Sequence, residues 1–285
     1  MDPGALPSPL DLFDLPFART ALAELTLLAV SGGLLGAFVV LRRLAFFAHA
    51  VGTATFPALV VADATGFSAT LAGLSAATAY AGGVERAARS TRDPGDSATG
   101  LLLVAALGGG VLLASDVFES GAGVDRLLFG TAIGLNGGDL ALSGAAAGLA
   151  LAATVLFGRT WTAVGFDPDS AGALGLPVGR ADMLLLGSIA LAAVAALPAV
   201  GALLVSSLFV VPAAVARLFA RDVRALLAAS VAVALAIAAI GLYLSLWLDV
   251  APGPAVAVLG AGTYGVCAIA AGLRPTAPAP AAGIA

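Results

Sequence analysis

Residues 166–180 read FDPDSAGALGLPVGR, a short polar stretch between two long apolar runs. Asp167 suits the N-cap of a helix, because its carboxylate accepts hydrogen bonds from the first free backbone N–H groups. Pro168 suits the first turn, and Asp169 suits the positive end of the helix dipole. Gly175 tolerates the left-handed conformation that often ends a helix. The stretch therefore predicts one short helix, set apart from the apolar segments on both sides.

The composition places those apolar segments in a membrane. The chain is 60% hydrophobic and 11% charged, with a mean hydropathy of +1.06. Crossing a hydrocarbon layer of roughly 30 Å takes about 20 residues in a helix, and several uncharged runs approach or exceed about 18. The chain is therefore predicted to be all-α, a polytopic integral membrane protein with about eight to nine transmembrane helices in one domain.

The arginines predict the orientation of these helices. All 13 basic residues are arginines, and arginine is enriched on the cytoplasmic side of a membrane. Arg42 and Arg43 follow the first predicted span, and Arg159 and Arg180 flank the short helix at 167–175. The N-terminus is therefore expected outside the cell membrane, and the short helix and the C-terminus inside it.

Three regions follow from this topology. Residues 1–16 are rich in Pro and Asp and are expected to form an extracytoplasmic arm. Residues 17–274 form the membrane domain, and residues 275–285 form a low-complexity, disordered cytoplasmic tail. Residues 124–135 are too short and too charged to cross, so an interfacial or re-entrant helix on the outer face is predicted.

The absence of lysine excludes two kinds of site. A phosphate-binding loop that ends in Gly-Lys-Ser/Thr and a Schiff-base lysine both require that residue. If the chain drives transport, the energy must come from an ion gradient or from a separate nucleotide-binding partner. The single Cys267 excludes an intramolecular disulfide.

Polar side chains within the predicted spans are candidates for a transit pathway. His49, Thr53 and Pro57 recur every four residues and share one helical face, and a helix broken at proline is tolerated in a membrane where it lines a cavity. Glu24 is costly in lipid, so it should be either a functional site or a hydrogen-bonding partner of a neighbouring helix. Asp63 is either a solvated helix end or an entry ligand.

The returning segment 202–219 holds further candidates. Ser206 and Ser207 can hydrogen-bond across helices, and Pro212 is expected to kink the segment. A purely structural role for the serines is the simpler interpretation. Pairs of glycines four residues apart also predict close helix packing; the pairs are Gly32 with Gly36 and Gly144 with Gly148.

Taken together, these segments resemble the permease subunits of the zinc, manganese and iron family of bacterial ABC importers. The stretches that carry the resemblance are GLLGAFVVLRRLAFFAHA (33–50), DRLLFG (125–130), DPDSAGALGLPVGRADMLLL (167–186), VGALLVSSLFVVPAAVARLFARD (200–222) and GLYLSLWLDVAPGPAVAVL (241–259). The resemblance implies a type II ABC importer-like bundle, a second permease copy in a homodimer, a cytoplasmic ABC ATPase dimer that binds ATP, and an extracytoplasmic metal-binding protein. It implies no cofactor held by this chain, no enzymatic activity of its own and no nucleic-acid partner.

The resemblance also implies roles for single residues. The short helix becomes a cytoplasmic coupling helix that sits in a cleft of the ATPase. Its implied coupling residues are Asp167, Asp169, Ser170, Ala171, Leu174 and Gly175.

The second span differs from the family pattern at the two positions that are thought to contact the metal. Family members carry Asp and His four residues apart after the paired arginines, whereas this chain has His49 and Thr53 at those positions. A neutral imidazole suits zinc or manganese, but a hydroxyl is a poor replacement ligand. Glu24 is a candidate for the missing carboxylate, and metal uptake by Glu24→Gln and His49→Ala variants tests that idea.

The leading hypothesis is an ATP-driven permease for a divalent metal ion, zinc or manganese. A permease of the same architecture for a metal chelate stays open because of the altered pair. A proton-coupled secondary transporter, with Glu24 or His49 as the relay, is the second alternative; the exposed coupling-type helix and the lack of evident inverted symmetry speak against it. A membrane enzyme has little support, because paired carboxylates, a His-Glu-x-x-His motif and a nucleophile elbow are all missing.

Overall fold

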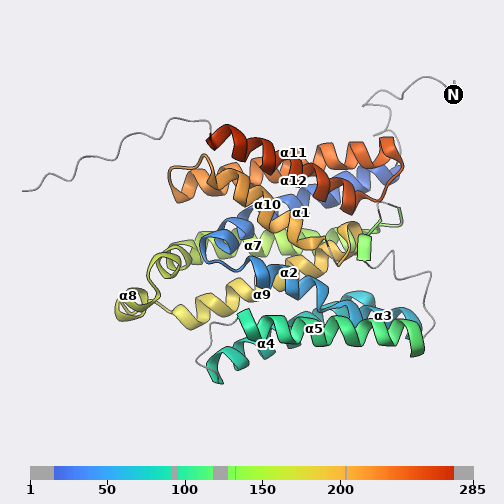
Figure 1. Ribbon diagram of the computed structural model, residues 1–285, viewed down its shortest axis with the longest axis horizontal. Helices are drawn as coiled ribbons and strands as arrows, with labels where there is room; N and C mark the ends of the chain where they lie inside the picture. The colour runs from blue at the N-terminus through green and yellow to red at the C-terminus, as the bar shows by residue number, and fades with distance from the viewer. Residues whose placement is uncertain (1–15, 91–95, 118–127, 132, 203, 273–285) are drawn as a thin grey trace, which may run out of the picture.

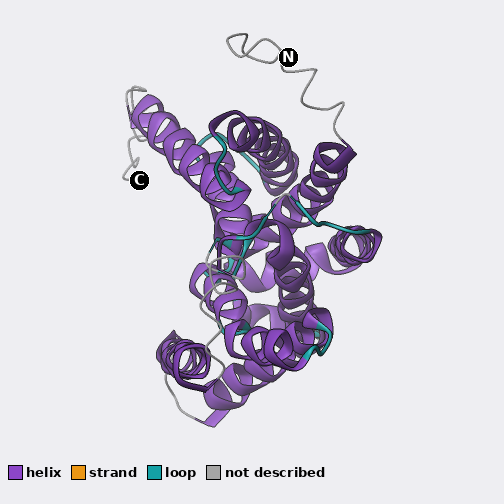
Figure 2. Cartoon of the chain, turned by 90° about the vertical axis from the view of Figure 1, so that its right-hand side faces the viewer, coloured by secondary structure: helices purple, strands orange, loops and turns teal. Residues whose placement is uncertain are grey.

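The computed structural model describes residues 16–90, 96–117, 128–131, 133–202 and 204–272, and the regular structure in these residues is entirely helical (Figures 1 and 2). The elements are α1 (Pro16–Leu41), α2 (Ala45–Thr53), α3 (Phe56–Thr65), α4 (Ala69–Ser90), α5 (Asp96–Leu112), the π-helical turn η2 (Leu113–Val117), α7 (Gly137–Phe166), α8 (Pro168–Ala173), α9 (Val178–Val200), α10 (Val205–Arg217), α11 (Val223–Leu248) and α12 (Pro252–Gly272).

The described helices confirm a multi-span membrane fold. Seven segments are long and apolar enough to cross a membrane: α1, α2 with α3, α5 with the first part of η2, α7, α9, α11 and α12. The less apolar α4 and the shorter α10 occupy the places of the two remaining predicted crossings. The number of crossing segments agrees with the sequence prediction of about eight to nine, because hydropathy locates the apolar part of a span well.

Helix α7 extends past the end of its uncharged apolar run. The uncharged apolar run ends before Arg159, but the helix runs for 30 residues, from Gly137 to Phe166. Its N-terminus has a capping box, in which the Asn136 and Asp139 side chains each accept a backbone N–H of the other residue. At about 45 Å it is longer than the hydrocarbon layer is thick, and α8 follows directly at its C-terminal end.

The bundle is built around α1, which packs against α7, α9, α10 and α11. The predicted glycine pair on α1 is confirmed as a close-packing face against α10. A Cβ at Gly32 would lie 2.9 Å from the carbonyl oxygen of Leu208, and one at Gly36 would overlap the carbonyl oxygen of Phe209. Only glycine lets the two backbones approach this closely.

The second glycine pair was wrongly predicted. A Cβ at Gly148 would meet nothing within 4 Å, and one at Gly144 would reach only Leu27, at 3.9 Å. The buried face of α7 is made instead by Ser143, Ala146, Ala150 and Ala153, among others. Because α7 is rich in alanine and glycine all round, the four-residue spacing alone could not identify the packed face.

We expect Gly36→Ala to destabilise the protein, because the new methyl group would overlap the Phe209 carbonyl. Overpacking of this kind costs about 1–3 kcal/mol. The measurement is the thermal midpoint of the purified protein in detergent. Gly148→Ala is the matched control, since its methyl group meets nothing within 4 Å. Equal midpoints for the two variants would contradict the close packing of α1 on α10.

The bundle has two distinct ends. Figure 1 shows α8 at the left end together with the C-terminal end of α12, while α1 begins at the right end. Figure 2 looks along the bundle from the end at which α1 begins. The predicted tail 275–285, the arm apart from Pro16, and part of the predicted interfacial segment (124–127) lie outside the described residues.

The described part of that interfacial segment packs against the turn between α9 and α10. The Thr131 N–H donates to the Pro198 carbonyl oxygen at 3.0 Å. Gly130 and Gly201 both adopt left-handed backbone angles, with φ of 72° and 83°, and a Cβ at Gly201 would overlap the Leu128 carbonyl. The turn begins after Val200, because α9 continues through Pro198.

Candidate functional site

The only histidine of the chain lies at the contact between α2 and α10. His49 is half-buried, and its Nδ1 shares a hydrogen bond with Ser206 Oγ at 3.1 Å. Gly52, one turn further along α2, keeps the helices close: a Cβ there would lie 3.2 Å from the Cβ of Val205. The structure thus brings together two of the residues that the sequence singled out separately.

The hydrogen bond to Ser206 influences which ring nitrogen of His49 is free to bind a metal ion. When Nδ1 carries the proton and donates it to Ser206 Oγ, Nε2 keeps the lone pair with which a neutral imidazole binds a metal ion. Partners of this kind commonly fix the tautomer and the ring orientation of metal-binding histidines. Within the part of the chain that the structure describes, His49 makes no other side-chain hydrogen bond.

Thr53 and Pro57 lie on either side of a break in the second span. Helix α2 ends at Thr53, and α3 begins at Phe56, one residue before Pro57. The Thr53 hydroxyl donates to the His49 carbonyl oxygen at 3.2 Å, and the Thr55 hydroxyl donates to Gly52 O at 2.6 Å. Both hydroxyls thus bond to carbonyl groups of α2, and Thr53 stabilises the backbone that carries His49.

Of the two predicted serines on α10, only Ser206 reaches another helix. The Ser207 hydroxyl donates to Leu204 O at 2.6 Å, within its own turn. Pro212 is buried inside α10 and has no N–H to offer to Leu208 O. That oxygen faces Gly32 of α1. Ser207 and Pro212 therefore affect the local structure of α10, whereas Ser206 contributes to the His49 site.

Glu24 lies in a different interface. Its side chain is fully buried, and its Oε1 accepts a hydrogen bond from Ser143 of α7 at 2.5 Å. Its Oε2 is also buried and has no hydrogen-bond partner among the described residues. Because His49 bonds to α10 and Glu24 to α7, the structure does not join the two into one ligand set.

Asp63 also stands apart from His49. It is exposed near the end of α3, beyond the break that separates this helix from α2 and His49. Among the described residues, no group of three or more His, Cys, Asp or Glu side chains is placed to hold a metal ion. The arrangement can therefore offer an ion a single imidazole and nearby oxygen atoms, which suits brief contact better than tight binding.

The short helix α8 has the predicted local structure. The Ser170 N–H donates to Asp167 Oδ1 at 3.0 Å, and the Ser170 hydroxyl donates to Oδ2 at 2.5 Å, so Asp167 is the N-cap. Gly175 has the expected left-handed φ of 73°. Leu174 is 77% exposed, but Ala171 is only 1% exposed and packs against its own chain. The Ala171 side chain is therefore turned toward its own chain, whereas Leu174 lies on the exposed surface of α8.

A cluster of contacts beside α8, which was not predicted from the sequence, joins α7 and α9 to the end of α1. The buried Trp161 of α7 donates its Nε1–H to Ala181 O of α9 at 2.7 Å, and its ring meets Phe38 of α1 edge-on at 4.9 Å. Arg42, just after α1, forms an ion pair with Asp182 of α9 at 2.6 Å. These contacts join the end of α1 to α7 and α9, the two helices that pack against α8.

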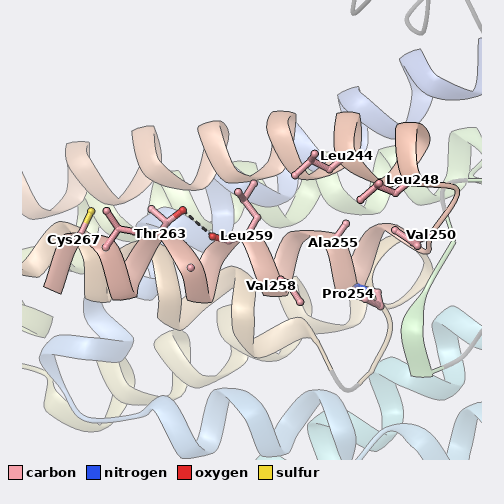
Figure 3. Close-up of a pocket in the computed structure, with 11 residues that line it drawn as sticks. Leu244, Leu248, Val250, Pro254, Ala255, Val258, Leu259, Thr263 and Cys267 are labelled. Atoms are coloured by element: carbon pink, nitrogen blue, oxygen red, sulfur yellow. Dashed lines mark hydrogen bonds between the residues drawn. The ribbon is translucent and has the colours of Figure 1, made fainter. Parts of the chain in front are cut away.

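A large groove on the outside of the bundle does not belong to this site. It has a volume of about 760 Å³ and lies between α11 and α12, lined by apolar side chains such as Leu244 and Val258 (Figure 3). The hydroxyl of Thr263 in its wall donates to Leu259 O at 2.8 Å. Such a lining offers little to a cation.

The comparison with known proteins agrees with the resemblance stated from the sequence. The description "ABC 3 transport family" matches residues 14–271. The manganese transport system membrane protein MntC of Halalkalibacterium halodurans is 28% identical over 253 residues, covering 89% of this chain and 87% of that protein. The chelated iron transport system membrane protein YfeD of Yersinia pestis is 25% identical over 263 residues, covering 92% and 88%.

A solved structure shares the fold. PsaBC from Streptococcus pneumoniae, in complex with Fab, matches with a TM-score of 0.80 at 22% identity, covering 91% of this chain and 94% of that chain. The likeness extends over almost all the described helices. With the family match, it identifies the chain as a member of the ABC 3 transport family, a membrane-spanning permease of the metal ABC importers.

Proposed function

We propose that this chain passes a divalent metal ion, manganese or zinc, across the cell membrane by way of His49, in an importer driven by ATP. The observation that carries the proposal is the His49–Ser206 contact between α2 and α10, inside the bundle of a metal permease. A neutral imidazole suits both ions. The manganese transport named for MntC favours manganese.

The proposal assigns the energy source to other subunits. Without lysine, the chain has no Gly-Lys-Ser/Thr loop for ATP. An ATPase dimer would bind the exposed surface of α8 around Leu174, on the cytoplasmic side. An extracytoplasmic metal-binding protein would deliver the ion at the other end, and a second copy of the permease would complete the membrane core. The N-terminus is then outside and the C-terminus inside.

The cluster of contacts beside α8 would transmit a movement of α8 to the helices that carry His49 and Ser206. Arg42 and Asp182 join α9 to the end of α1. The next residue, Arg43, has a left-handed φ of 58° and turns the chain directly into α2. Arg217, at the end of α10, donates to Val40 O of α1 at 3.3 Å. Both helices of the His49–Ser206 contact are thus linked to the end of α1, so a displacement of α8 can change that contact.

A metal chelate is the second candidate cargo. It is favoured by the lack, among the described residues, of a group of three or more side chains that could hold a metal ion, and by the chelated iron transport named for YfeD. A chelate brings its own ligands and needs fewer from the pathway. Proton-coupled transport remains the alternative of a different class, because His49 or Glu24 could relay a proton.

We expect the permease, reconstituted in liposomes with its ATPase and binding protein, to accumulate radioactive manganese only when ATP is supplied, and zinc to compete. The candidate partners are the products of the genes beside this one. ATPase activity that responds to an iron chelate and ignores both free ions would favour the second candidate. Uptake by the permease alone, driven by a pH gradient, would overturn the ATP-driven proposal.

A further inference from the structure

A second groove lies at the α8 end of the bundle, between α7 and α11. It has a volume of about 490 Å³. Helices α7 and α11 both pack against α1, and Phe38 of α1 lines the groove between them. Its other principal lining residues are Thr154, Gly158 and Arg159 from α7 and Arg224 and Leu227 from α11. In a membrane, such a gap must be filled by lipid or by protein.

The two arginines are placed at the depth of lipid headgroups. Arg159 lies about 33 Å along α7 from its start, just beyond a hydrocarbon layer of roughly 30 Å. Arg224 is the second residue of α11. Both side chains are exposed, and neither forms an ion pair or side-chain hydrogen bond within the described parts of the chain. Their charges are therefore available to an anion.

The part of the groove nearer the membrane centre is apolar apart from one hydroxyl. Thr154 lies more than a turn deeper than Arg159, and its Oγ1 is buried without a hydrogen-bond partner among the described residues. Leu227 provides partly exposed apolar surface, and the buried ring of Phe38 forms the floor of the groove. A free anion would pair with the arginines but would leave this hydroxyl and the apolar walls unmatched.

We propose that this groove binds an anionic phospholipid of the leaflet on the α8 side. The phosphate lies between Arg159 and Arg224, because guanidinium groups bind phosphate through paired, charge-assisted hydrogen bonds. The Thr154 hydroxyl donates to an ester carbonyl oxygen of the glycerol backbone, and an acyl chain covers Leu227. Basic pockets between helices on the cytoplasmic side of membrane proteins commonly bind anionic lipids.

The test compares lipids retained by the full-length protein in native mass spectrometry, after equal exposure to phosphatidylglycerol and phosphatidylcholine. We expect the wild type to prefer phosphatidylglycerol by about 30-fold, the effect of two arginines near a membrane surface. Arg159→Gln with Arg224→Gln should bring the two lipids close to parity. The matched control is Arg86→Gln with Arg180→Gln, which changes the net charge equally and should keep the preference.

Thr154→Val is the second variant, since it preserves the shape of the side chain and both arginines. It should lose part of the retained phosphatidylglycerol, and it keeps the test decisive if the arginine variants fold poorly. The proposal is overturned if the control pair loses as much lipid as the groove pair, or if inorganic phosphate displaces phosphatidylglycerol. It is also overturned if the groove variants change only the association of two copies of the chain.

Discussion

His49→Ala should lower metal uptake by the reconstituted importer about 100-fold or more, since even partners of metal ligands are worth 10–100-fold. The chain has no other imidazole, and the described residues contain no group of three or more His, Cys, Asp or Glu side chains that could hold the ion instead. ATP hydrolysis by the partner subunit should persist, because His49 lies away from α8. Uptake of radioactive manganese and release of phosphate, measured on the same liposomes, check both expectations.

Glu24→Gln is the matched contrast to His49→Ala. Glutamine keeps the shape of the side chain and an oxygen that accepts from Ser143 in the buried α1–α7 interface. Uptake should therefore stay close to the wild-type rate. If Glu24→Gln stops uptake while His49→Ala leaves it intact, the carboxyl group is the transit ligand and the site described at α2 and α10 is wrong.

Ser206→Ala separates a positioning role from a structural one. Without the hydroxyl, nothing on α10 favours the tautomer of His49 that leaves Nε2 free, so we expect the apparent affinity for manganese to fall about tenfold, at the lower end of the effect of such partners. Ser207→Ala is the control, because that hydroxyl bonds within its own turn. An equal effect of the two changes would remove Ser206 from the site.

The features that the sequence predicted well depend on local chemistry. The cap at Asp167 and the left-handed Gly175 each require only the residues within one turn. The spans depend on runs of apolar residues, which hydropathy detects directly. Arg159 shows the limit of this reasoning: a charge marks the edge of the lipid, but the helix continues past it to Phe166.

The features that the sequence missed depend on contacts between distant segments. Arg42 was interpreted only as a sign of orientation. Its ion pair was not predicted, because its partner Asp182 lies 140 positions away in the sequence. The resemblance placed Ala171 on the ATPase contact, but the side of α8 that faces the chain is set by tertiary packing. Glu24 and His49 were considered together because both are unusual in lipid, and only the structure shows that they bond to different helices.

Breaking the Arg42–Asp182 ion pair should uncouple ATP hydrolysis from uptake. The pair joins α9, which follows α8, to the end of α1 beside the turn into α2. In Arg42→Gln or Asp182→Asn, α8 can still bind the ATPase, so hydrolysis continues while the motion reaches His49 poorly. We expect about tenfold less metal carried per ATP hydrolysed, within the range of typical coupling energies.

The neighbouring arginine supplies the control for this experiment. Arg43→Gln removes the same charge from the same end of α1, but Arg43 is exposed and is not part of the ion pair. It should therefore keep the wild-type ratio of metal to ATP. Exchanging the two partners, Arg42→Asp with Asp182→Arg, should restore part of the ratio, because a double-mutant cycle isolates the pairwise interaction. A wild-type ratio of metal to ATP in Arg42→Gln, or an equal loss in Arg43→Gln, would contradict a role for the ion pair. The motion of α8 would then reach His49 by another route. The next contact to remove is the hydrogen bond from Trp161 to Ala181.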